Sequence, residues 1–137
     1  MNYQESLKFI EESHKFGIRL GLENSLKLLE LLGNPQDKLK IIHVAGTNGK
    51  GSVCSFIANS LHAQGYKVGL YTSPYLEKFT ERIRINGENI PEEDVARIVT
   101  LMREKIEQMV KEGFSYPTEF EIETAMAFYY YWEQGVD

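Results

Sequence analysis

A glycine-rich heptapeptide is the feature that most constrains the fold of this chain. It reads Gly46-Thr47-Asn48-Gly49-Lys50-Gly51-Ser52 and directly follows the apolar, β-branched run Lys40-Ile41-Ile42-His43-Val44-Ala45. Such a run is typical of a strand buried on both faces of a parallel sheet. Beyond the heptapeptide, the spacing of apolar residues predicts a helix over 52–64 and a second strand over 67–72. The sequence therefore predicts a strand, loop, helix and strand in succession.

The heptapeptide itself predicts a polyphosphate-binding loop. Its glycines allow consecutive backbone N–H groups to point into one concavity, the start of the helix adds a partial positive charge, and Lys50 supplies a mobile cation. It departs from the strict P-loop pattern, because Val44 stands in place of the first glycine and Gly51 follows the lysine. Ser52 would then take the hydroxyl role. The alternative is an ordinary glycine-rich turn with an exposed lysine.

Composition and charge restrict the classes of function that this chain can have. The chain has 137 residues, 42% of them hydrophobic, and a net charge of −5, which disfavours a nucleic-acid binder. Residues 1–90 carry eleven basic and nine acidic groups (+2), whereas residues 91–137 carry four and eleven (−7), so an anion site is expected in the first part. The single cysteine, Cys54, and the lack of a long apolar run favour a cytoplasmic protein without a membrane segment.

The rest of the chain alternates between helix and strand signals. Apolar spacing predicts further helices over 3–13, 22–32, 91–113 and 119–134, and residues 82–90 resemble a small hairpin with its turn at Asn86-Gly87. Val136-Asp137 would begin another strand. The expected fold is a P-loop type α/β nucleotide-binding domain, with a mostly parallel sheet, flanking helices and a small β-hairpin excursion, truncated at its C-terminus.

Three segments together resemble the folylpolyglutamate synthases and dihydrofolate synthases of the Mur ligase superfamily. The first is the heptapeptide with the preceding His43-Val44-Ala45, where Gly51 replaces the threonine typical of cell-wall Mur ligases. The second is Thr72-Ser73-Pro74-Tyr75-Leu76 with residues 79–87, and the third is Pro117-Thr118-Glu119-Phe120-Glu121 with residues 124–128. The resemblance covers the whole chain. It implies that residues 1–137 are the N-terminal portion of the ATP-binding domain, without the C-terminal glutamate-binding domain.

The resemblance also implies an activity and a set of site residues. The activity is ATP-dependent addition of L-glutamate to the γ-carboxylate of a folate, with dihydrofolate synthesis as a further possibility, by an enzyme that is monomeric in full length. ATP would be held by Gly46, Thr47, Asn48, Gly49, Lys50, Gly51 and Ser52, with Lys50 catalytic. Ser73 and Glu121 would bind Mg²⁺, and Arg82 would contact the folate.

Each of these assignments has a local alternative. Ser73-Pro74 is also a common loop start, Thr118 to Glu121 is also a helix capping box, and Arg82 and Arg84 fit a half-exposed strand. Two other functions remain open as well. One is a different P-loop enzyme, a small-molecule kinase, and the other is a nucleotide-binding module that is inactive as this fragment.

Overall fold

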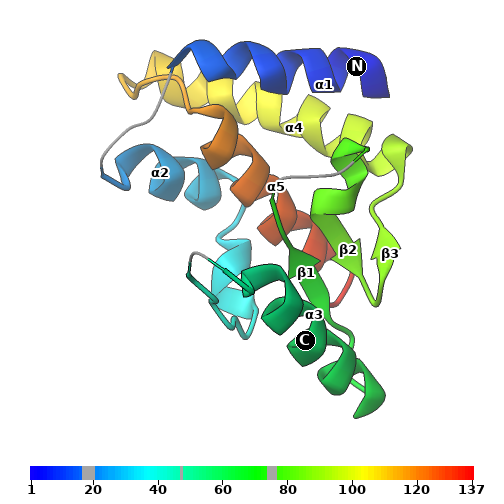
Figure 1. The fold of residues 1–137 in the computed structure, drawn as a ribbon. Helices are drawn as coiled ribbons and strands as arrows, with labels where there is room; N and C mark the ends of the chain where they lie inside the picture. The colour runs from blue at the N-terminus through cyan, green and yellow to red at the C-terminus, as the bar shows by residue number, and fades with distance from the viewer. Residues whose placement is uncertain (17–20, 47, 74–76) are drawn as a thin grey trace.

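The computed structural model describes residues 1–16, 21–46, 48–73 and 77–137. Its described part is an α/β structure with five α-helices, one on each predicted helical segment (Figure 1). They are α1 (Tyr3–Glu12), α2 (Glu23–Leu31), α3 (Lys50–Ala63), α4 (Glu92–Lys111) and α5 (Glu119–Glu133). Three 3-10 turns lie between them: η1 (Ser13–Phe16), η2 (Pro35–Lys38) and η3 (Phe79–Arg82). No described helix is both long enough and apolar enough to cross a membrane.

A small antiparallel sheet lies beside the helices. It consists of β1 (Gly69–Tyr71), β2 (Ile83–Ile85) and β3 (Glu88–Asn89), in that order. The turn between β2 and β3 has positive φ at both central residues, 50° at Asn86 and 83° at Gly87, as a two-residue hairpin turn requires. This confirms the predicted hairpin. It is not an excursion, however, because β2 pairs directly with β1, with Tyr71 opposite Ile83.

The predicted parallel sheet is wrong for the described residues, whose strands all pair antiparallel. Residues 40–45 form no strand, and the side chains of Ile41 and Ile42 are 55% and 62% exposed. Asp137 lies between Lys40 and Lys67. Its N–H donates to the carbonyl of Lys67 (2.9 Å), and its carbonyl accepts from the N–H of Lys40 (3.2 Å). A strand is defined by hydrogen bonds to neighbours, and this one contact does not extend into a ladder.

The apolar side chains of α3 are not buried in the described structure. Val53 and Phe56 are 48% and 76% exposed, and no residue of this helix is buried. The helix contacts β1 on one side. In the described structure no other element covers the apolar face of α3, so apolar side chains are exposed there.

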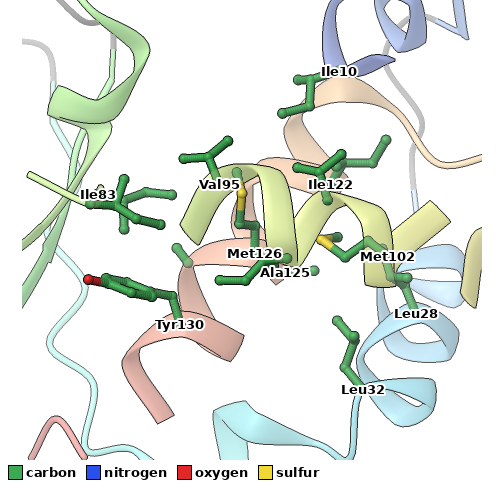
Figure 2. Packing of buried hydrophobic residues seen from close by; sticks show 14 of the residues in the cluster. Ile10, Leu28, Leu32, Ile83, Val95, Met102, Ile122, Ala125, Met126 and Tyr130 are labelled. Atoms are coloured by element: carbon green, nitrogen blue, oxygen red, sulfur yellow. The ribbon is translucent and has the colours of Figure 1, made fainter. Parts of the chain in front are cut away.

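The hydrophobic core forms around α5, which lies between the helices α1, α2 and α4 and the sheet (Figure 1). Ile122, Ala125 and Met126 on α5 face Val95 and Met102 on α4, and Ile83 approaches from the sheet (Figure 2). Leu28 and Leu32 close the same cluster from the side of α2. The position of α5, and with it the position of its first turn, therefore depends on contacts with α1, α2, α4 and the sheet.

Gly69 provides a stability test of the contact between the sheet and α5. A Cβ atom at Gly69 would lie 2.8–2.9 Å from ring carbons of the buried Tyr131, so Gly69→Ala forces the ring or β1 to move. We expect the free energy of unfolding to fall by about 1–3 kcal/mol. Gly51→Ala is the control, since a Cβ there meets nothing within 4 Å and alanine favours a helix. Equal urea midpoints for Gly69→Ala and the parent chain would contradict this contact.

Candidate nucleotide and metal site

The glycine-rich loop leads into the exposed N-terminus of α3. Gly49 is the N-cap, with φ of 73°, and no side chain caps the helix. The first N–H groups of an α-helix have no acceptor within the helix, so here they remain available to an anion. A Cβ at Gly46, Gly49 or Gly51 would meet nothing within 4 Å, so the surface beside these glycines is open.

The other residues of the loop are at this surface as well. Asn48, Lys50 and Ser52 are exposed, and Thr47 lies outside the described residues. Lys50 is the first residue of α3, so its ammonium group adds to the positive end of the helix. The predicted loop therefore has the local geometry and charge of an anion site.

Ser73 follows the end of β1. Its side chain is exposed, and the residues that come next in the predicted motif, Pro74, Tyr75 and Leu76, lie outside the described residues. α3 runs away from the glycine-rich loop and β1 returns beside it, so the N-terminus of α3 and the C-terminus of β1 lie at the same end of this pair (Figure 1). Ser73 therefore follows β1 at the end where the glycine-rich loop enters α3.

Glu121 makes a capping box at the start of α5. Its Oε1 accepts from the N–H of Thr118 (2.9 Å), and the Thr118 hydroxyl accepts from the N–H of Glu121 (3.2 Å). Its Oε2 accepts from the hydroxyl of Ser25 on α2 (3.0 Å). Both carboxylate oxygens thus have protein partners, and the local alternative to a metal ligand is present in the structure.

The capping role predicts a difference between two substitutions of Glu121. Glutamine retains a carbonyl oxygen for Thr118 and an amide for Ser25, so Glu121→Gln should leave the free energy of unfolding nearly unchanged. Glu121→Ala removes both contacts and should cost about 0.3–1.5 kcal/mol. Urea denaturation of the two variants measures this. A loss in Glu121→Gln as large as that in Glu121→Ala would show that the charge, and not the cap, matters.

Arg82 lies in a buried ion pair that the sequence did not reveal. Its Nη1 is 2.5 Å from Oε2 of Glu123, and the two side chains are only 16% and 2% exposed. Burial raises the pKa of Glu123 to about 7, and Arg82 opposes that rise while the nearby Glu119 adds to it. The only signal for Glu123 was a charged residue inside the otherwise apolar stretch of α5.

Arg82 also lines a pocket of about 290 Å³ between α1 and the segment before β2. Lys78, Phe79 and Glu119 share this lining, so the pocket has groups of both charges and an aromatic ring. In the structure Arg82 pairs with Glu123. Its predicted contact with a folate stays a prediction.

The described residues do not assemble a complete metal centre. Among them no group of three or more His, Cys, Asp or Glu side chains could hold a metal ion. Ser73 has an exposed hydroxyl, and each carboxylate oxygen of Glu121 keeps a second lone pair beside its hydrogen bond. Mg²⁺ commonly takes one or two protein oxygens and completes its shell with water and phosphate, so these two residues fit such a site only as partial ligands.

Fold and site together define an α/β protein with a glycine-rich loop at the N-terminus of a helix. No protein-family model matches the chain. The dihydrofolate synthase/folylpolyglutamate synthase of Bacillus subtilis is 44% identical over 131 residues, which is 96% of this chain and 30% of that protein. The structure of folylpolyglutamate synthase from Thermotoga maritima matches with a TM-score of 0.89 and 46% identity over 98% of this chain and 31% of that one.

A third match is the structure of a complex of folylpolyglutamate synthase (FPGS) with AMPPCP and folate. Its TM-score is 0.90, with 41% identity over all of this chain and 34% of that one. The chain belongs to the folylpolyglutamate synthase and dihydrofolate synthase family, as the three sequence motifs indicated. It spans about a third of the length of the relatives that it matches.

Proposed function

We propose that the full-length protein is an ATP-dependent ligase that adds L-glutamate to the γ-carboxylate of a folate, and that this chain is the N-terminal portion of its ATP-binding domain. The observation that carries the proposal is the open, uncapped N-terminus of α3 behind the glycine-rich loop. The similar structure that holds AMPPCP and folate supports both ligand classes. ATP would bind along Gly46–Ser52 with Lys50 on its outer phosphates.

The chemistry of amide formation explains why such a site is needed. A carboxylate is a poor acylating agent, so its oxygen first attacks the γ-phosphorus of ATP, and ADP leaves. The amine of glutamate then attacks the carbonyl carbon of the acyl phosphate, phosphate leaves, and the amine loses a proton. Both steps develop charge on phosphate oxygens, which Lys50 and the N–H groups of α3 would stabilise.

We further propose that Ser73 and Glu121 contribute to a Mg²⁺ site. The ion would neutralise phosphate charge and orient the transferring group. The exposed hydroxyl of Ser73, at the strand edge shared with the N-terminus of α3, supports its part. For Glu121 the test is the substitution that keeps the helix cap, Glu121→Gln. In the full-length protein this variant should raise the Mg²⁺ concentration needed for half-maximal turnover. An unchanged requirement would assign this carboxylate to the cap alone.

The proposal is tested by the substrate dependence of ATP hydrolysis in the full-length protein. We expect phosphate release only when a folate and glutamate are both present. Formation of ADP and a phosphorylated hydroxyl acceptor, with neither free phosphate nor an amide product, would instead identify a small-molecule kinase. Binding of ATP without hydrolysis under any of these conditions would identify a nucleotide-binding module.

A further inference from the structure

The segment between β1 and β2 is closed at its base. The N–H of Thr72 donates to the carbonyl of Arg82 (3.0 Å), directly beyond the pairing of Tyr71 with Ile83. Thr72 and Arg82, the two ends of the β1–β2 loop (residues 72–82), therefore meet at one point. Ser73 is the second residue of this loop, so its position depends on how the base is held.

Both ends of the β1–β2 loop contact α5. On the β1 side, the hydroxyl of Tyr71 lies 3.4 Å from the hydroxyl of Thr124. On the β2 side, Arg82 pairs with Glu123. Thr124 and Glu123 are adjacent in sequence, less than one turn after Glu121. One short stretch of α5 thus holds both ends of the loop.

The second half of the loop is braced from within. The carboxylate of Glu81 accepts from the N–H of Glu77 (3.2 Å) and from that of Lys78 (3.0 Å), and the Nε of Arg84 donates to the carbonyl of Glu81 (2.8 Å). Phe79 and Thr80 are buried. Residues 77–82 are therefore held together by their own hydrogen bonds, and the ion pair of Arg82 with Glu123 lies at their end.

We infer that Arg82 and Glu123 are positioning residues whose ion pair, with the contact between Tyr71 and Thr124, fixes the Ser73 hydroxyl relative to the first turn of α5. The inference rests on the proposed function, since it gives Ser73 a place in the nucleotide site. Arg82 would then act through the loop. The directional guanidinium–carboxylate contact suits this role better than a lysine would, because a guanidinium presents its donors in a fixed plane.

The alternative is an ion pair that only stabilises the fold. Removing one partner of a buried pair leaves an uncompensated charge and destabilises any protein, so single substitutions to apolar residues do not separate the two roles. Replacing both partners with apolar residues of similar volume is often tolerated. The double variant Arg82→Met/Glu123→Met therefore removes the directional contact without leaving a buried charge.

The experiment compares this double variant and Arg82→Lys with Arg97→Met in the full-length protein. Arg97 pairs with Glu133 (2.6 Å) at the other end of α5 and serves as the matched control. One readout is the Mg²⁺ concentration for half-maximal, folate- and glutamate-dependent turnover. The other is amide hydrogen exchange of residues 72–82. Thermal midpoints show whether each variant is folded.

For the two variants at Arg82 we expect faster exchange in the β1–β2 loop and a Mg²⁺ requirement raised about 10- to 100-fold, as when an outer-shell partner of a metal ligand is lost. The control should change neither. A folded double variant with parental exchange and a parental Mg²⁺ requirement would overturn the inference. Absence of turnover in the parent protein would overturn the proposed function alone, and loop exchange would then decide the positioning role.

Discussion

Replacing Lys50 with alanine is expected to lower the turnover of the full-length protein by about 100- to 1,000-fold, the usual cost of losing one donor to a developing charge. Lys50 is exposed at the first position of α3, so the substitution removes a cation without opening a cavity. The thermal midpoint should therefore be unchanged while ATP affinity and turnover fall together. Initial rates and calorimetric titration with ATP measure both.

Lys40→Ala is the matched control for Lys50→Ala. Lys40 is also an exposed lysine, placed before the glycine-rich loop instead of after it, and the hydrogen bond that it donates to Asp137 comes from its backbone. We expect parental ATP affinity in this variant. If the two variants lose the same affinity, the effect of Lys50 is general electrostatic attraction, and its assigned contact with the outer phosphates is wrong.

Met126→Ala should destabilise the 137-residue chain more than any surface change, by about 2–5 kcal/mol. Met126 is fully buried on α5, in the cluster that also contains residues of α2, α4 and β2 (Figure 2). The neighbours belong to several elements that cannot all move into the space, so part of the cavity will persist. Urea denaturation followed by far-UV circular dichroism gives the change in free energy.

Phe120→Ala on the same helix is the control for Met126→Ala. Phe120 has the larger side chain, yet it is 64% exposed, so its removal should change the free energy of unfolding by no more than about 0.5 kcal/mol. A loss at Phe120 equal to that at Met126 would mean that α5 packs with another face than the one observed.

Features that depend on local sequence were predictable. Apolar spacing placed all five helices, Asn86-Gly87 placed the hairpin turn, and the Thr118 to Glu121 spacing gave the capping box. Each of these is decided within a few residues, by helix propensity, by positive φ or by one side chain reaching a nearby backbone N–H.

Features that depend on distant partners were not predictable from the sequence. The run of residues 40–45 has a strand's composition, but composition supplies no neighbouring strand, and the described residues offer it only the contact with Asp137. The pairing of Arg82 with Glu123 joins positions 41 residues apart, and neither residue alone indicates its partner. Sequence patterns therefore located the glycine-rich loop and the cap, whereas the link between Arg82 and α5 required the structure.

The measurement that tests the central claim most directly is the mass of the folate after incubation of the full-length protein with ATP, Mg²⁺ and L-glutamate. The account predicts a product heavier than the starting folate by one glutamyl residue, formed together with one ADP, and absent when ATP is omitted. ADP formation with the folate unchanged in mass would contradict it.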